Sequence, residues 1–363
     1  MLKLRRGVVV STAPLTVMVG EERRPAWADA AVVGEVAEGD HVIVNTEARD
    51  LGLGSGGFDI VHANLTRGLG GGGGPKTAHV MKLNYTPLQH AVEPVERVVG
   101  ETGETGGASV ATSPPALVLP LHGHLAPAAW AAAKARPGLQ VGYVQTAGGA
   151  LPGSLSKDVA ELRGRGLLAG HITAGPAYGG EHEAITVAGG LDAAAHRLGW
   201  DAILCGPGPG ILGSATLYGH GGITALESAH AALALGMPTL VSPRLSGADP
   251  RARHRGLSHH TATVLKLLLA PVRIPVPEIE LEGWPTGEEG LDELDLPSVL
   301  DALHEACEDR HDVAVRPVDL EGYAASGLPT QVMGRTIAED PLFFAAPLAA
   351  GGALAGAGRI GPE

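Results

Sequence analysis

The stretch PTLVSPRLSGADPRARHRGLSHHTATVLKLLLA, residues 238–270, carries the pattern that decides the fold. It begins with an apolar run typical of a buried strand, Pro238–Val241, and ends with a helix-like run, Thr261–Ala270. The segment between them contains four Arg and three His against a single Asp. A connection of this length inside a compact α/β unit is uncommon unless it is a binding loop, a lid or a disordered segment. The stretch therefore predicts a strand–loop–helix unit whose loop is the first candidate for a ligand site.

The same alternation of strand and helix runs through the whole C-terminal part of the chain. The strand-like runs are Ala116–Leu121, Gln140–Gln145, Leu167–Thr173, Ala202–Cys205, Pro238–Val241 and Val272–Val276. The helix-like runs between them are Ala128–Ala135, Ser156–Arg165, Glu183–Leu198, Ile223–Leu235 and His259–Ala270. Buried-type strands that alternate with helices favour a doubly wound, mostly parallel sheet with helices on both faces.

The N-terminal part shows a different pattern, with short β-branched runs separated by turn residues. These runs are Gly7–Val10, Leu15–Val19, Ala31–Val36, His41–Asn45, Phe58–Ala63 and Ala78–Leu83. Strands of this length and spacing predict a small β barrel or sandwich over residues 1–100. The glycine-rich run Gly68–Lys76 is interpreted as a flexible hairpin tip, because no helix follows it that would make it a phosphate cradle.

These patterns divide the chain into four parts. We expect a β domain over residues 1–100, a linker over 101–115, an α/β ligand-site domain over 116–330 and an apolar tail over 331–363. The tail is too short and too weakly hydrophobic to span a bilayer, so we expect it to pack on the body or on a partner chain. A helix near Pro297–Asp309 and a strand at Val313–Pro317 complete the domain.

Charge and cysteine content narrow the class of protein. The net charge of −13 argues against a nucleic-acid-binding surface, although thirteen of the acids lie in one segment, Glu278–Asp312. Cys205 and Cys307 form no paired motif, which fits a reducing, cytoplasmic location. The N-terminus lacks the pattern of a signal peptide. We expect no membrane partner, a small anionic ligand and assembly into a homo-oligomer.

Polar side chains follow five of the predicted strands, and the carboxyl ends of parallel strands share one edge of the sheet. Open α/β sheets bind ligands at that edge. The candidate catalytic residues there are His122, His124, Glu181, His182, His259 and His260. One of the imidazoles would move a proton, and a neighbouring glutamate would tune it. The alternative is that these histidines only cap loops.

A metal site is a second interpretation of the same edge. His122 and His124 are two residues apart, so in an extended strand both side chains point the same way. With His182 they would form a three-imidazole site. Adjacent histidines at a strand end resemble the first-strand motif of metal-dependent amidohydrolases. Those barrels need eight strand–helix units, however, and the sequence offers only six or seven. The sequence leaves the presence of a metal or cofactor open.

Anion binding is predicted from loops on the same edge. The run Gly208–Gly213 matches the glycine spacing of dinucleotide-binding turns, but Pro207 and Pro209 remove amide donors and no acid follows at the expected distance. The candidate anion ligands are Gly208, Gly210, Gly213, Ser214, Arg244, Arg251, Arg253 and His254. Arginine forks suit carboxylate and phosphate groups. The alternative is that these arginines pair with the acidic segment 278–312.

Three motifs carry a resemblance to a known family: His171–Gly180 (HITAGPAYGG), Gly206–Gly210 (GPGPG) and Arg253–Thr261 (RHRGLSHHT). The chain resembles a family of hypothetical proteins from Gram-positive bacteria, chiefly actinobacteria, described as a domain of unknown function. The resemblance covers most of the chain and implies a cytosolic bacterial protein. It implies no activity, cofactor or catalytic residue.

The residues therefore favour an enzyme, a hydrolase or a transferase, that acts on a small phosphorylated or carboxylated metabolite at the carboxyl edge of the sheet. Two alternatives stay open. The first is a non-catalytic protein that binds a small ligand or assembles with itself. The second is a metal-dependent hydrolase whose ligands are histidines.

Overall fold

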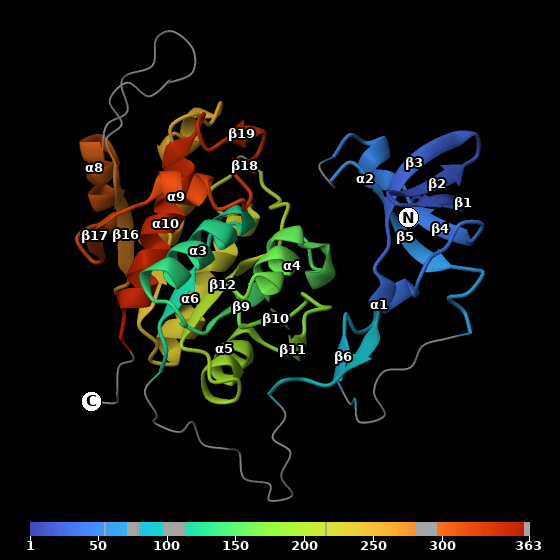
Figure 1. Cartoon of the computed structure of the whole chain (residues 1–363), viewed down its shortest axis with the longest axis horizontal. Helices are drawn as coiled ribbons and strands as arrows, with labels where there is room; N and C mark the ends of the chain where they lie inside the picture. The colour runs from blue at the N-terminus through green and yellow to red at the C-terminus, as the bar shows by residue number, and fades with distance from the viewer. Residues whose placement is uncertain are drawn as a thin grey trace, which may run out of the picture. The chain divides into compact units, whose positions relative to one another are not determined.

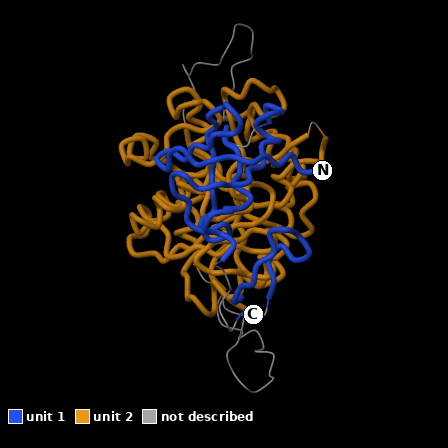
Figure 2. The backbone as a smooth tube through the Cα atoms, turned by 90° about the vertical axis from the view of Figure 1, so that its right-hand side faces the viewer, with its two compact units in different colours: residues 1–94 blue, residues 95–363 orange. Residues whose placement is uncertain are grey.

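The computed structural model describes residues 1–53, 56–70, 78, 80–96, 113–214, 216–279 and 296–358. The chain forms two compact units, residues 1–94 and residues 95–363 (Figure 2). Some predicted segments lie partly outside the described residues, among them 71–76 of the glycine-rich run, 101–112 of the linker, 280–295 of the acidic segment and 359–363 of the apolar tail.

The first unit is a closed barrel with the strand order β1-β2-β3-β5-β4. Its strands are β1 (Leu4–Thr12), β2 (Leu15–Val19), β3 (Glu22–Trp27), β4 (His41–Asn45) and β5 (Asp59–Asn64). β1 closes on β4 antiparallel, and β3 pairs with β5 parallel, as in a five-stranded OB-type barrel. Inward-facing valines fill it, among them Val9, Val17, Val42, Val44 and Val61. The prediction of a small N-terminal barrel is confirmed.

Two details of this unit differ from the prediction. β3 was not predicted, because its charged residues hide the apolar pattern of a strand. One of them, Arg24, is buried, and its Nε donates to Asp59 at 2.5 Å. The run 31–36, predicted as a strand, instead supplies the short helix α1 (Ala30–Val33). Asp29 caps that helix by accepting a hydrogen bond from the backbone N–H of Ala31 at 3.1 Å. The unit also contains α2 (Glu47–Asp50) and a hairpin of β6 (Val80–Lys82) and β7 (His90–Val92).

The second unit is built on an eight-stranded sheet with the order β11-β10-β9-β12-β8-β13-β16-β17. The strands are β8 (Ala116–Val118), β9 (Val141–Thr146), β10 (Gly170–Ala174), β11 (His182–Ala184), β12 (Ala202–Pro207), β13 (Thr239–Val241), β16 (Arg273–Glu278) and β17 (Asp312–Pro317). All neighbouring pairs run parallel. The predicted doubly wound parallel sheet is confirmed, with β11 as an edge strand that the sequence analysis assigned to a helix.

Helices cover both faces of this sheet (Figure 1). Alternate side chains of the strands point to opposite faces. Leu117 and Leu204 pack with α3 (Leu125–Ala135), α4 (Lys157–Gly164) and α10 (Pro341–Gly356). Their neighbours Val118 and Ile203 pack with the helices of the other face. Those helices are α5 (Val187–His196), α6 (Thr224–Ala234), α7 (His259–Leu267) and α8 (Leu296–Cys307).

The predicted apolar tail supplies α10, which is apolar on all sides and buried along almost its whole length. The tail thus packs on the body of its own chain. Gly351 lets α10 approach α3 closely, because a Cβ at this position would lie 2.1 Å from the carbonyl oxygen of Ala128. The short α9 (Leu320–Ala324) and the pair β18 (Gln331–Val332) and β19 (Arg335–Thr336) precede it. None of the described helices has the length and apolar composition of a membrane span.

Candidate functional site

The loop that follows β13 is an ordered ribbon. β14 (Leu245–Ser246) and β15 (Gly256–Leu257) pair antiparallel, and a 3-10 turn, Ala252–His254, lies between them. Ser258 then caps α7, since its side-chain oxygen accepts a hydrogen bond from the backbone N–H of His260 at 3.3 Å. The arginines and histidines of the loop are therefore carried on a fixed backbone.

The buried carboxylate of Asp249 holds this ribbon together. Arg251 donates to it from Nε and Nη2, both at 2.9 Å, and Arg244 donates from Nη2 at 3.1 Å. Burial by itself raises the pKa of Asp249, but the hydrogen bonds and charge of Arg251 and the charge of Arg244 outweigh it, so this pKa lies well below its usual range. Asp249 is fully buried, so these interactions lie in a desolvated region.

A second buried acid joins the ribbon to the start of α10. Asp340 accepts from Ser246 Oγ at 2.6 Å and from the backbone N–H of Gly247 at 2.9 Å. Arg335 bridges the two acids, since its Nε lies 3.0 Å from Asp340 and its Nη2 lies 3.5 Å from Asp249. The alternative pairing of the loop with segment 278–312 is not seen among the described residues, where Arg244 and Arg251 pair with Asp249.

Four histidine rings meet beside this ribbon. His254 comes from the 3-10 turn, His259 and His260 from the first turn of α7, and His220 from the loop after β12. The rings of His220 and His260 are stacked, with centroids 3.6 Å apart. The other close pairs are His259–His260 at 4.3 Å, His254–His260 at 4.8 Å and His254–His259 at 4.9 Å. We call these four residues the histidine cluster.

Unpartnered polar atoms are concentrated here. Of the seven buried side-chain nitrogen and oxygen atoms that have no hydrogen-bond partner among the described residues, five belong to this region. They are His124 Nε2, His220 Nδ1, Arg244 Nε, His254 Nε2 and His259 Nε2. Buried polar groups in proteins are nearly always hydrogen-bonded, so this concentration sets the region apart from the rest of the described chain.

Burial keeps these imidazoles neutral at pH 7. It lowers the pKa of His254 and of His124 to about 3, and that of His260 to about 2. It also lowers the pKa values of His220 and His259. The charge of Arg244 contributes in the same direction to all five residues. Burial lowers the pKa of Arg244 itself to about 10, which leaves its guanidinium charged at neutral pH.

Hydrogen bonds fix one ring and orient two others. His220 Nε2 lies 3.0 Å from the carbonyl oxygen of Leu217, which can only accept, so Nε2 carries the proton and Nδ1 offers a lone pair. His254 Nδ1 lies 2.7 Å from Ser258 Oγ, and His124 Nδ1 lies 2.8 Å from Ser242 Oγ. In both residues the hydroxyl engages Nδ1, so Nε2 on the opposite side of the ring is available to another partner.

Three residues of the cluster have the spacing of a possible metal site: His254, His259 and His260. One ring nitrogen from each lies within 4.8 Å of the other two. In the described parts of the chain, this is the one group of three His, Cys, Asp or Glu residues with such spacing. The three-imidazole site predicted from His122, His124 and His182 is therefore wrong.

The reason lies in the backbone after β8. His122 and His124 were expected in an extended strand, but they form a 3-10 turn that leads directly into α3. Their rings consequently have different partners. His122 Nε2 lies 2.8 Å from Ser156 Oγ, its Nδ1 lies 3.2 Å from the carbonyl oxygen of Pro207, and burial lowers its pKa. His122 thus has both nitrogens engaged.

Glu181 and His182 lie at the far end of the sheet. β11 is the edge strand, and five strand spacings of about 4.8 Å separate it from β13, a distance of roughly 24 Å. In Figure 1, β16 lies toward the left of the sheet and β11 toward its lower right, so the two strands are near opposite ends of the strand order. Glu181 pairs with Arg163, whose Nη2 donates at 2.9 Å. The five predicted strand ends share one edge of the sheet, as expected, but this edge is too long for Glu181 and His182 to lie at one site with His259 and His260.

The glycine loop after β12 packs against the loop after β9. A Cβ on Gly208 would lie 2.3 Å from the carbonyl oxygen of Ala150, and the Ala150 N–H donates to the carbonyl of Pro209 at 2.7 Å. Ser214 uses its hydroxyl and its backbone N–H on the carbonyl of Gly219. The next helix, α6, begins only at Thr224, so Gly210 and Gly213 do not open a helix as a dinucleotide-binding turn would.

Three of the predicted anion ligands lie on the ribbon after β13: Arg251, Arg253 and His254. The side chain of Arg253 is exposed and that of His254 is buried. His220 is not among the candidate residues that the sequence predicted, but the stacking of its ring on His260 places it in the histidine cluster. Sequence reasoning also assigned no role to His171, which is stacked on Tyr143 with centroids 5.4 Å apart and whose Nε2 lies 3.1 Å from Gln145 Oε1.

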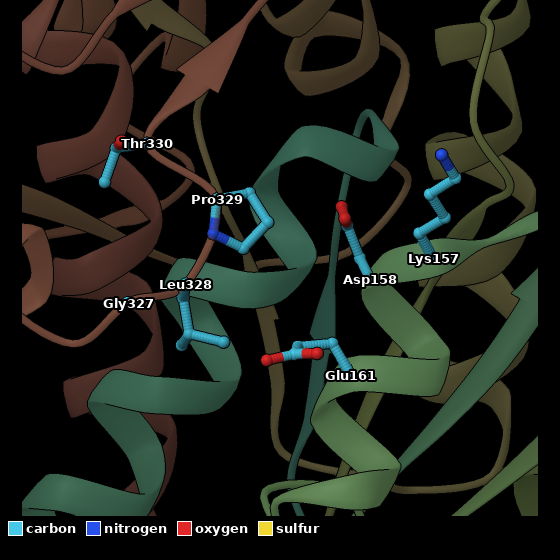
Figure 3. A pocket seen from close by; sticks show the side chains of 7 residues that line it. All are labelled: Lys157, Asp158, Glu161, Gly327, Leu328, Pro329 and Thr330. Atoms are coloured by element: carbon cyan, nitrogen blue, oxygen red, sulfur yellow. The ribbon is translucent and has the colours of Figure 1, made fainter.

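A separate pocket of about 410 Å³ lies between α4 and residues 327–330 (Figure 3). Asp158 and Glu161 extend from α4 toward the segment that carries Leu328 and Pro329. The carboxylate of Asp158 is 3.8 Å from His122 Nε2. None of the residues that line this pocket belongs to the histidine cluster.

Comparison with known proteins assigns a family. A family model described as "Protein of unknown function (DUF3866)" matches residues 26–351. The chain belongs to the DUF3866 family. The expected membership in a family of unknown function is confirmed, whereas the bacterial distribution stays a prediction. A comparison of this DUF3866 protein with curated proteins finds no match.

Among solved structures, the DUF3866 protein matches the crystal structure of YjeQ from Thermotoga maritima. The identity is 9%, and the alignment covers 73% of this chain and 65% of that chain, with a TM-score of 0.14. The chain thus spans less than two thirds of YjeQ, and a TM-score this low supports no conclusion about fold or function.

Proposed function

We propose that this DUF3866 protein is an enzyme, a hydrolase or transferase, that acts on a small phosphorylated or carboxylated substrate at the histidine cluster. One observation carries the proposal: among the described residues, four unpartnered imidazole nitrogens and the unpartnered Nε of the buried Arg244 occur in one region. Groups of this kind are costly to bury without partners. A ligand that supplies hydrogen-bond partners to these atoms offsets that cost.

The charge of this region suits an anion. Arg244, Arg251 and Arg335 face the two buried acids Asp249 and Asp340, which leaves one positive charge in excess. Arg244 Nε is the donor without a partner, while its Nη2 is held by Asp249 at 3.1 Å. A guanidinium fixed in this way offers a directed hydrogen bond to a carboxylate or phosphate oxygen.

The histidine cluster supplies the acid–base group of the proposed reaction. His220 is neutral at pH 7, its tautomer is set by Leu217, and its Nδ1 offers a buried lone pair. A neutral imidazole in that state accepts a proton as a general base. His259 is only partly buried, so the cluster is in contact with solvent at one side.

Cysteine chemistry has no part in the proposal. Cys205 and Cys307 are buried free thiols. Burial raises the pKa of Cys205 to about 12 and that of Cys307 to about 11, so neither is a thiolate nucleophile at neutral pH. Free thiols of this kind fit the cytoplasmic location that we propose for the enzyme.

The test is turnover of p-nitrophenyl phosphate, bis-p-nitrophenyl phosphate and p-nitrophenyl acetate, together with the Tm shift caused by orthophosphate. We expect Arg244→Lys to raise KM by about tenfold or more, because one charge-assisted hydrogen bond is lost. We expect His220→Gln to lower kcat by about 100-fold or more. The control is Arg273→Lys, since Arg273 is an exposed residue paired with Asp312.

No turnover of any of these esters together with no Tm shift would contradict the proposal. A Tm shift without turnover would overturn the enzyme in favour of a ligand-binding protein. Kinetic constants that change as much in Arg273→Lys as in Arg244→Lys would remove Arg244 from the site.

A further inference from the structure

We propose that His254, His259 and His260 bind one divalent transition-metal ion, of which Zn²⁺ is the prototype. The inference deepens the proposed function by naming a cofactor for the same site. It rests on that function only for the role of the metal in catalysis, because metal binding can be measured without any substrate.

The spacing of the three donors is close to that of a metal site. One nitrogen from each residue lies within 4.8 Å of the other two. Zinc bonds to histidine at about 2.0–2.1 Å, so tetrahedral ligands lie roughly 3.4 Å apart. In the proposed site the nitrogens approach one another by up to roughly 1.4 Å through rotation of the imidazoles on the same backbone.

Two of the three proposed ligands also have a nitrogen in a suitable chemical state. Nε2 of His254 and Nε2 of His259 are buried without hydrogen-bond partners among the described residues. His254 Nδ1 lies 2.7 Å from Ser258 Oγ. Histidine ligands commonly donate their second N–H to an oxygen acceptor, which orients the ring and raises its basicity. Ser258 supplies such an acceptor to His254.

The backbone that carries the ligands is fixed independently of the metal. His259 and His260 occupy the first turn of α7 after the capping residue Ser258. His254 lies in the 3-10 turn of the ribbon that Asp249 holds. Ligands on such elements lose little entropy when they bind, which favours a preformed site.

A three-histidine site leaves one coordination position open, as catalytic zinc sites do. Such an ion lowers the pKa of its bound water to about 7, which supplies a nucleophile at neutral pH. In hydrolysis, the water oxygen forms a bond to the phosphorus or carbonyl carbon, and the bond to the leaving oxygen breaks. His220 takes the proton from the water and returns it to the leaving group, so water is the only co-reactant.

His220 lies next to the ligands for this role. A Cβ on Gly222 would lie 3.2 Å from His220 Nδ1 and 3.5 Å from His260 Nδ1. The two nitrogens thus border the same small space, and the glycine keeps side-chain atoms out of it. The stacking of the His220 and His260 rings holds this arrangement.

The experiment is a titration of the full-length protein, dialysed against EDTA, with Co²⁺ and with Zn²⁺. The visible absorption of tetrahedral Co²⁺ reports ligation, and elemental analysis gives the zinc stoichiometry. We expect one ion per chain for the wild type. His259→Ala should weaken binding by more than 100-fold, and Ser258→Ala by about 10- to 100-fold. His304→Ala, at an exposed position of α8, is the matched control and should bind as the wild type does.

The metal-free far-UV circular dichroism of each variant establishes that it is folded, and His254→Gln serves as a second ligand variant. Sub-stoichiometric Co²⁺ uptake by the wild type would overturn the metal site, as would equal affinities of His259→Ala and His304→Ala. Full metal binding without turnover would keep the metal site and contradict the proposed function. Turnover by metal-free protein would keep the function and remove the metal from it.

Discussion

Asp249 is the residue on which the order of the candidate site depends, and Asp249→Asn tests this directly. The substitution keeps the size of the side chain but removes its charge. Three hydrogen bonds from Arg244 and Arg251 then lose their anionic acceptor, and the buried guanidinium of Arg244 loses its counterion. Breaking a buried ion pair from one side costs about 3–5 kcal/mol. We expect a loss of that size in the free energy of unfolding.

The assay is urea unfolding at pH 7, followed by far-UV circular dichroism. Asp312→Asn is the matched control, because Asp312 forms an exposed ion pair with Arg273 at 2.7 Å. Exposed pairs contribute about 0–1 kcal/mol. A difference of less than about 1 kcal/mol between the two variants would refute the reasoning. It would mean that Asp249 does not hold the ribbon.

Three further predictions concern stability and the site. Gly351→Ala should destabilise the protein by about 1–3 kcal/mol or more in urea unfolding, whereas Gly352→Ala, where a Cβ meets nothing within 4 Å, should be neutral or stabilising; equal effects would contradict the close packing of α10. Because burial and Arg244 lower the pKa of His124 to about 3, the unfolded state binds more protons between that value and about 6.5, so the free energy of unfolding falls as pH drops through this window. His124→Gln should flatten that dependence, and an unchanged pH profile would show that His124 is not held neutral. Ser258→Ala should cost about 1 kcal/mol through loss of the α7 cap, while Ser258→Thr retains most of it.

Much of the fold could be predicted from the sequence because the apolar periods of the second unit are distinct. Each predicted strand of that unit lies within three residues of its observed bounds, and the largest differences are at the end of β8 and at the start of β10. The missed elements are short or polar. β3 carries Arg and Glu, and β11 is only three residues long, so neither shows a clear apolar alternation.

The site was predicted less well, for two physical reasons. The sequence identifies strand ends but not strand order, and the order places β11, with His182, five strands from β13. The backbone after β8 turns, so His122 and His124 diverge. The stacking of His220 on His260 and the hydrogen bond from Ser246 to Asp340 each join residues far apart in the chain. No local sequence pattern reveals such contacts. By contrast, Arg244, His254, His259 and His260 lie in the loop that its charge singled out.

The central claim is that the unpartnered nitrogens around Arg244 form the ligand site. The most direct test is a long-range ¹H–¹⁵N NMR titration of the imidazoles of the full-length protein with orthophosphate and with oxalate. The account predicts that the nitrogen resonances of His220, His254 and His259 shift together and saturate, while that of His62 in the barrel does not move. The same titration of Arg244→Lys should require at least about tenfold more anion. Resonances of the histidine cluster that stay unchanged up to saturating anion would contradict the account.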